Sequence, residues 1–412
     1  MPGTLDIPPF TTASASHPWP IRALNRAGRW LPEGRALSGA AVWEAAREGT
    51  LADCQPSPEA AEALEILLDS MASNMKLTLV GRVSAKDDTV RIARTHLRLH
   101  RALHETPETR RVELPSPVFI VGWPRTGTTF LHQLMACDPA SRTIPYWESF
   151  DPVPPAPGRP DRRVEKLDQT LGLLRRIAPR YDAIHPMTAD STEECVALFM
   201  NEFRTLQFDF QYAVPDYVRW LLGEDAGIAY EAYRRQLELI HFHRPVGERQ
   251  VLKDPTHLVH LETLVARFPD AKFIFTHRDP VVAMSSIASL TAYTRALFTD
   301  DVDPEAVGAE IFGGYWSEAL DRSRRIRAKL PTGRAVDVRH PDLRADPVGT
   351  VEEIYHSLGL DFTEAARAAM EHHLAARAAK PSGRHLHSIE GFGLRAEAVR
   401  ERFEAYCTEL DL

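Results

Sequence analysis

Long apolar runs, paired cysteines and an excess of basic residues are all missing from this sequence. No apolar stretch approaches the ~18 residues that a membrane-spanning helix needs, and the N-terminus lacks the basic segment and apolar run of a secretory signal. Four cysteines, Cys54, Cys137, Cys195 and Cys407, lie far apart, with neither C-x-x-C pairing nor the spacing of metal ligands. These absences predict a cytoplasmic protein with reduced thiols and no membrane span.

The charge balance limits the class of partner. The 412 residues carry a formal net charge of −8, which argues against nucleic-acid binding by bulk electrostatics. Any site for an anion must therefore be built locally from a few side chains and backbone amides. With 44% hydrophobic and 26% charged residues, the chain has the composition of a globular protein with one or two domains.

The N-terminal part of the chain is expected to be an arm followed by helices. Residues 1–20 are rich in Pro, Ser and Thr, which is typical of a surface segment. From Ser57 and Pro58, a favourable N-cap and first-turn pair, apolar residues recur at helical spacing, and a second helical run covers about 88–104. We therefore assign residues 1–110 to an N-terminal arm and helical extension.

The remaining residues, 111–412, are predicted to form one main domain that contains an insertion. The Pro-rich stretch PVPPAPGRP at 152–160 is incompatible with a helix or a central strand. It opens a mostly helical insertion at about 152–245, which carries a cluster of aromatic residues between Phe199 and Trp220. These aromatics either line a ligand pocket or fill the core, and the sequence leaves both open.

Three short segments share a pattern that indicates the fold class. FIVGWP at 119–124, VLKDP at 251–255 and FIFTHRDP at 273–280 each read as an apolar strand, a turn and a proline near the start of a helix. A further strand at 335–339 precedes a helix at 347–358. Alternating strands and helices predict an α/β fold, a parallel β-sheet flanked by helices in a P-loop NTPase-like three-layer sandwich. Because ligands bind at the carboxyl ends of such strands, all three turns should face one site.

The stretch VFIVGWPRTGTTFLHQL resembles a phosphate-binding loop without its lysine. Gly122, Gly127 and Thr129 fit the pattern G-x-x-x-x-G-K-[ST], whereas Thr128 stands at the lysine position. Amides at a helix N-terminus bind oxyanions, and Arg125 adds positive charge to the loop. A substrate with a single 5′-phosphate and a less charged transferable group needs neither that lysine nor a metal.

These residues resemble the family of sulfotransferases that use 3′-phosphoadenosine 5′-phosphosulfate (PAPS). The family's 5′-phosphosulfate loop has the form P-[KR]-[ST]-G-T-T, and its 3′-phosphate element places Arg and Ser eight residues apart, as Arg278 and Ser286 are here. The loop positions are matched by Pro124, Arg125, Thr126, Gly127, Thr128 and Thr129. The resemblance covers residues 115 to about 405. It implies a catalytic domain over 111–412, PAPS as co-substrate, 3′,5′-bisphosphoadenosine (PAP) as product, and no metal.

The resemblance also implies roles for basic residues. Arg125 stands where the family stabilises the leaving group, and Lys253 stands where several relatives carry a second catalytic lysine. The alternative interpretation of Lys253 is a structural lysine. Near the C-terminus, Lys380 and Arg384 lie in a Gly- and Pro-containing loop, where relatives close the 3′-phosphate pocket with a basic loop. The usual R-K-G string is absent.

Three residues compete for the role of the base that deprotonates the acceptor. Glu148 comes first, because some branches of the family use a glutamate at the end of the strand that follows the loop's helix. Glu194 comes second: it belongs to the pair Glu193 and Glu194, of which at most one can point inward from a helix. His257 comes third, because it is two residues out of register with the histidine that cytosolic branches use.

The predicted function is sulfuryl transfer from PAPS to a hydroxyl group, less favourably an amine, of a small and apolar acceptor. Two alternatives remain open. One is an ATP-dependent phosphotransferase, which would need magnesium, and the other is a catalytically silent nucleotide-binding protein on the same fold. The acceptor's identity and the oligomeric state do not follow from the sequence.

Overall fold

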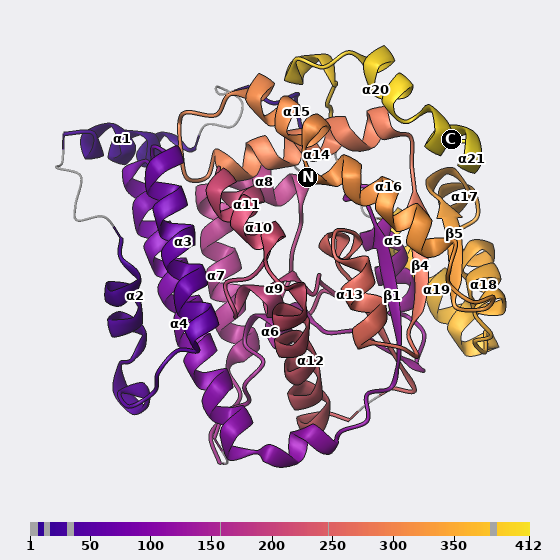
Figure 1. Ribbon diagram of the computed structural model, residues 1–412, viewed down its shortest axis with the longest axis horizontal. Coiled ribbons are helices and arrows are strands. Elements are labelled where there is room, and N and C mark those ends of the chain that lie inside the picture. Colours follow the sequence, from indigo (N-terminus) through magenta and orange to yellow (C-terminus); the bar gives the residue numbers. More distant parts are fainter. Residues whose placement is uncertain (1–6, 12–16, 31–36, 157, 246, 380–384) are drawn as a thin grey trace.

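A computed structural model describes residues 7–11, 17–30, 37–156, 158–245, 247–379 and 385–412. Its centre is a parallel five-stranded sheet with strand order β2-β3-β1-β4-β5. In Figure 1 the sheet stands to the right of the bundle that begins with the N-terminal helices. The strands are β1 (Ser116–Gly122), β2 (Ser141–Arg142), β3 (Arg249–Lys253), β4 (Lys272–His277) and β5 (Ala335–Arg339).

Helices make up most of the rest of the described chain. The α-helices are α1 (Trp19–Gly28), α2 (Gly39–Ala46), α3 (Pro58–Asn74), α4 (Leu79–Glu105), α5 (Thr128–Met135), α6 (Tyr146–Phe150), α7 (Arg163–Ile177), α8 (Pro179–Ile184), α9 (Val196–Met200), α10 (Gln207–Gln211), α11 (Pro215–Gly223), α12 (Ala226–His243), α13 (Leu261–Arg267), α14 (Pro280–Arg295), α15 (Pro304–Gly313), α16 (Tyr315–Arg327), α17 (His340–Ala345), α18 (Pro347–Ser357), α19 (Glu364–Ala378), α20 (Ala396–Arg402) and α21 (Glu404–Leu410). Short 3₁₀ helices are η1 (Gly49–Leu51), η2 (Pro107–Arg111), η3 (Pro255–Leu258) and η4 (Glu390–Phe392).

The central strand β1 is buried on both faces, as an uninterrupted apolar run predicts for a parallel sheet. Its side chains alternate between two cores. Phe119 and Val121 pack with residues of α12 and α13, whereas Val118 and Ile120 pack with residues of α5, α17 and α18. The predicted α/β class, with helices on both faces of a parallel sheet, is confirmed.

Side-chain caps mark the starts of the helices that follow Ser57, β3 and β4. The Ser57 hydroxyl accepts a hydrogen bond from the Ala60 amide at the start of α3, and the Asp279 carboxylate accepts one from the Val281 amide at the start of α14. After β3 the Asp254 carboxylate caps the short η3, which starts at Pro255, and the α-helix α13 begins only at Leu261. The helix predicted at 88–104 is the second part of the longer α4.

The N-terminal helices share a core with distant parts of the chain. Leu64 and Leu67 of α3 and Ile92 of α4 belong to the same buried cluster as residues of α11, α14 and α20. The Thr78 amide donates a hydrogen bond of 2.9 Å to the Phe298 carbonyl just after α14. The extension therefore packs directly on the main domain, and the division at residue 110 stays a prediction. Within the described residues, no helix is both long enough and apolar enough to cross a membrane.

A segment near the N-terminus is tied to a segment near the C-terminus. Ile7 forms a parallel bridge with His385, and its carbonyl accepts a hydrogen bond of 2.9 Å from the Leu386 amide. The Tyr293 hydroxyl of α14 donates to the Pro8 carbonyl at 3.0 Å. Ile7 is buried, so this contact is part of the core rather than a surface crossing.

Gly81, near the start of α4, lies against the Phe298 carbonyl just after α14, and this contact can be tested. A Cβ at Gly81 would lie 2.0 Å from the Phe298 carbonyl oxygen, so Gly81→Ala should destabilise the protein by about 1 to 3 kcal/mol. Gly172→Ala in α7 is the matched control, because a Cβ there meets nothing within 4 Å and removing a helical glycine should stabilise slightly. Thermal unfolding midpoints should fall for the first variant only. Equal midpoints would mean that α4 docks loosely.

Candidate active site

A cavity of about 640 Å³ lies at the carboxyl ends of the strands. The turn after β1 contributes Arg125, the turn after β3 contributes Pro255 and Thr256, and the turn after β4 contributes Arg278. The turns that follow β1, β3 and β4 therefore meet at one site, as the sequence pattern predicted. Parallel pairing of β1 with both β3 and β4 brings them together, because it aligns the carboxyl ends of all three strands.

The loop between β1 and α5 has the backbone conformation of an oxyanion cradle. Gly127 adopts a left-handed φ of 97°, and Arg125 does so with a φ of 69°, which is unusual for a residue with a side chain. The Thr126 hydroxyl donates to the Trp123 carbonyl at 2.7 Å and fixes the turn. No described side chain caps the first turn of α5, so its amides can bind an anion.

The two predicted cofactor elements are in direct contact. Nε of Arg125, in the loop, donates to the Ser286 hydroxyl on α14 at 3.0 Å. Nη1 of Arg278 donates to the backbone carbonyl of Arg125 at 2.8 Å. Residues more than 150 positions apart in the chain are thus brought into one polar group.

Beside this contact lies a second pocket, of about 420 Å³, which is strongly cationic. Burial and then the neighbouring Arg125 lower the pKa of the Arg278 guanidinium, although Asp279 acts in the opposite direction. An anion would relieve this repulsion between guanidinium groups. The pocket is lined by Arg125, Gly127, Phe130, Arg278, Ser286, His340, Arg344, Arg377, His385 and His387, without a carboxylate among the described lining residues.

Six of these pocket residues were not found from the sequence: Phe130, His340, Arg344, Arg377, His385 and His387. Arg344 lies on α17 and Arg377 on α19, and neither belongs to a recognisable motif. His385 and His387 immediately follow the predicted basic loop, and their rings bond to Ser289 and Ser285 of α14 at 2.9 Å and 2.7 Å. The alternating H-x-H pattern was the available signal. The predicted Lys380 and Arg384 lie outside the described residues.

Lys253 and Glu194 form a pair at the wall of the main cavity. Nζ of Lys253 donates to Oε1 of Glu194 at 2.6 Å and to the Thr129 hydroxyl at 3.2 Å. Burial alone would raise the pKa of Glu194, but the Lys253 ammonium, with smaller effects of His185 and Arg125, lowers it on balance. Lys253 is fully buried, whereas a quarter of the Glu194 side chain remains exposed, at 24%. Glu194 is thus an ionised carboxylate that faces the cavity.

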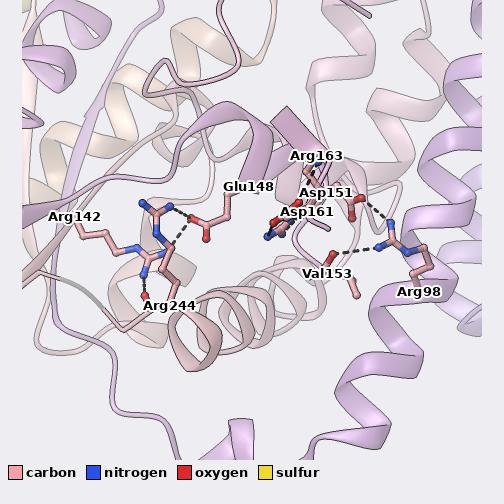
Figure 2. A network of polar contacts seen from close by, with 8 residues as sticks. All are labelled: Arg98, Arg142, Glu148, Asp151, Val153, Asp161, Arg163 and Arg244. Carbon is pink, nitrogen blue, oxygen red and sulfur yellow. Dashed lines mark hydrogen bonds and ion pairs between the residues drawn. The ribbon is translucent and has the colours of Figure 1, made fainter. Parts of the chain in front are cut away.

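Glu148 does not face the cavity, contrary to the expectation that its carboxylate lies beside the transferred group. It follows β2 at the predicted distance, on α6, but it is buried against two guanidinium groups (Figure 2). Its Oε2 accepts a hydrogen bond from Arg142 at 2.9 Å and lies 3.8 Å from Nη1 of Arg244. The residue satisfies the buried charge of Arg142, which a pattern of strand ends does not reveal.

His257 is also placed away from the cavity. Its ring is buried among Phe119, Phe199, Tyr230 and Tyr233, and its Nδ1 lies 2.9 Å from the Tyr230 hydroxyl. Burial lowers the pKa of His257 to about 3, so the ring stays neutral. We interpret it as a core histidine. Glu193 lines the cavity as well as Glu194, so the expectation that at most one of them points inward from a helix is wrong: both precede α9. The Glu193 Oε1 accepts a hydrogen bond from the Ser191 hydroxyl at 3.1 Å.

The rest of the cavity wall is largely apolar. Most of the aromatics between residues 199 and 220 turn out to be core: Phe203, Phe208, Tyr212 and Tyr217 are fully buried, and Phe210 faces the cavity. Apolar lining comes instead from α7 to α9. This lining includes Leu167, Leu171, Leu174, Ile177, Ile184, Met187, Val196 and Met200.

One group of described residues has ligand atoms close enough to hold a metal ion, and it lies outside the cavity. It consists of His96, His100 and Glu202. Nε2 of His96 accepts a hydrogen bond from the Ser57 amide at 3.1 Å, so Nδ1 carries the proton and donates to the Asn201 carbonyl at 2.9 Å. His96 therefore has no free lone pair for a metal, and the group serves to link α4 to the segment after α9.

Comparison with known proteins identifies the class of protein. The model of the sulfotransferase family matches residues 117–364, which is more than half of the chain. The chain belongs to the sulfotransferase family, and the predicted family and fold are confirmed. The match favours the sulfotransferase interpretation over a phosphotransferase or a silent nucleotide-binding protein.

Particular relatives come from mycobacteria. The omega-hydroxy-beta-dihydromenaquinone-9 sulfotransferase Stf3 of Mycobacterium bovis is 27% identical over 282 residues, 63% of this chain and 66% of the relative. The match to Stf3 thus spans just under two thirds of the length of that relative. Among solved structures, sulfotransferase STF1 from Mycobacterium tuberculosis H37Rv is 31% identical with a TM-score of 0.78, over 90% of this chain and 99% of that one. Sulfotransferase STF9 from Mycobacterium avium is 26% identical with a TM-score of 0.81, and the match covers 93% of this chain and 99% of that one.

The assignment of Glu148 to structure rather than chemistry can be tested by its effect on stability. Glu148→Gln would leave two guanidinium groups without their carboxylate, so the free energy of unfolding should fall by about 3 kcal/mol. Glu165→Gln is the matched control, because Glu165 pairs with Arg162 on the exposed surface and its loss should not be measurable. If Glu148→Gln kept its stability but lost turnover, the structural assignment would be wrong and Glu148 would again be a candidate for the catalytic base.

Proposed function

We propose that this protein transfers the sulfuryl group of PAPS to a hydroxyl group of an apolar acceptor, with Glu194 as the base. The observation that carries the proposal is the contact between Arg125 and Ser286, because it joins the loop expected to bind the 5′-phosphosulfate to the element expected to bind the 3′-phosphate. A nucleotide with phosphate groups at both positions would bridge the two.

The residues around this contact fit PAPS. The uncapped amides at Thr128 and Thr129 suit the 5′-phosphosulfate, while Arg278 and Ser286 suit the 3′-phosphate. The cationic lining of the second pocket offsets the charge of a bisphosphorylated nucleotide. When bound, PAPS supplies a sulfuryl group on an activated phosphosulfate linkage.

Two cations lie where charge develops during transfer. Arg125 projects from the cradle itself, and Lys253 contacts Thr129 at the first turn of α5. Preorganised charge of this kind stabilises a leaving oxygen without reorganisation. Because these side chains already supply positive charge at the loop, we propose that the transfer requires no metal.

Glu194 is proposed to accept the proton of the acceptor. It is an ionised group on the cavity wall, and the Lys253 ammonium fixes its orientation through a hydrogen bond of 2.6 Å. The backbone supports the same placement, because the Cys195 amide donates to the Lys253 carbonyl at 2.9 Å. A carboxylate held in this way can receive a proton from a hydroxyl that enters the cavity beside the loop.

The acceptor is proposed to be a small apolar molecule with a hydroxyl group. The apolar lining from α7 to α9 supports this class, since ligand pockets bind apolar surface with a few polar anchors. The name of the relative Stf3 describes a sulfotransferase for a hydroxylated menaquinone derivative, which is a hydroxyl acceptor of the same general class.

We also propose that the protein is cytoplasmic. All four cysteines are free, which supports this location.

Calorimetry with nucleotides tests the cofactor. PAP should bind about 10- to 100-fold more tightly than AMP, because the 3′-phosphate gains charge-assisted hydrogen bonds worth about 1.5 to 3 kcal/mol. Arg278→Met and Ser286→Ala should weaken PAP binding and leave AMP binding nearly unchanged, so AMP is the internal control. Equal affinities for PAP and AMP in the unmodified protein would contradict the assignment.

Turnover of Glu194→Gln tests the base. With labelled PAPS and a panel of alcohols, phenols and amines, its turnover should fall by ~10² or more while PAP affinity stays near normal. Glu193→Gln is the matched control, because the neighbouring carboxylate also lines the cavity but does not contact Lys253 in the described structure. If Glu193→Gln lost turnover and Glu194→Gln kept it, the roles of the two residues would be exchanged.

A further inference from the structure

One part of the apolar cavity wall carries a group of polar side chains that the proposed transfer does not use. Asp88 and Arg91 reach it from α4 of the N-terminal extension, and Gln207 and Gln211 reach it from α10. These four residues, which we call the second polar group, do not belong to the loop, the cationic pocket or the Lys253 and Glu194 pair. Polar residues in an apolar wall cost free energy unless they are hydrogen-bonded.

Asp88 and Arg91 form an internally neutral pair. Oδ1 of Asp88 accepts hydrogen bonds from Arg91, 3.2 Å from Nε and 2.6 Å from Nη2, and the guanidinium lies 4.0 Å from the centre of the Phe150 ring. Roughly a quarter of each side chain stays exposed, at 29% for Arg91 and 26% for Asp88. The pair thus presents hydrogen-bonding atoms without a net charge.

Gln211 provides an independent sign of a missing partner. Its Oε1 is buried and accepts no hydrogen bond from any described residue, although the residue lines the cavity. Such an unpaired amide oxygen is rare in proteins and is usually satisfied by water or a ligand. Tyr212, which follows Gln211 in the chain, lies within electrostatic range of the pair: burial raises the pKa of Tyr212, the Asp88 carboxylate acts in the same direction and Arg91 opposes it.

We propose that the second polar group binds a second functional group of the acceptor, which is neutral and forms hydrogen bonds, such as an amide, a carbonyl or a hydroxyl. The acceptor is then an apolar molecule that carries this neutral group in addition to the reactive hydroxyl. The inference rests on the proposed function and narrows its substrate class. A charged group is disfavoured because Asp88 already neutralises Arg91 and the surrounding wall is apolar.

Binding measurements in the presence of PAP test this subsite without requiring transfer. The probes are ω-hydroxyalkanamides of increasing chain length, each compared with the 1-alkanol and the ω-hydroxyalkanoate of the same length. At the length that spans the cavity, the amide should bind about 3- to 10-fold more tightly than the alkanol, as one or two neutral hydrogen bonds predict. Gln211→Leu should abolish this preference. Gln169→Leu, an exposed glutamine on α7, should keep it.

Asp88→Asn provides a second test that does not depend on loss of binding. This change keeps the size of the side chain but leaves Arg91 without its carboxylate, so the ω-hydroxyalkanoate should gain affinity relative to the amide. The inference is overturned if amide and alkanol bind equally at every length, if Gln211→Leu retains the preference, or if the unmodified protein prefers the carboxylate. Absent transfer from PAPS to any of these bound alcohols would instead overturn the proposed function.

Discussion

The buried ammonium group of Lys253 is the constraint on which the candidate site depends. A fully buried cation is tolerated only when it is paired and hydrogen-bonded, and here a carboxylate and a hydroxyl meet that need. The pairing joins the end of β3, the first turn of α5 and the segment before α9. Three regions that are far apart in sequence are therefore held at fixed relative positions by one charge. The oxyanion cradle and the proposed base cannot shift independently.

The sheet and the cofactor elements could be predicted because their signals are local. An apolar run followed by a glycine-containing turn specifies both the β1 strand and the loop, and the prolines at 255 and 280 mark the ends of β3 and β4. Parallel pairing then places the turns together without further information. The spacing of Arg278 and Ser286 predicted that the two residues share one pocket for the same reason, since both lie within one strand, turn and helix.

Residues whose roles depend on a distant partner were not predictable in the same way. Glu148 occupies the expected position after β2, but the neighbouring guanidinium of Arg142 and the more distant Arg244 determine where its carboxylate points. Arg344 and Arg377 reach the cationic pocket only because α17 and α19 pack beside α5. Likewise, the contribution of α4 to the cavity follows from its packing across the molecule, which no motif in the first 110 residues encodes.

The bridge between Ile7 and His385 closes a loop that contains almost the whole chain. Closing a loop of this length costs more conformational entropy than any local contact, so this bridge should be among the last contacts to form during folding and among the first to open. His385 lines the cationic pocket. Completion of the proposed nucleotide site is thereby coupled to the final closure of the fold, and a nucleotide bound there would hold the two distant segments of the polypeptide together.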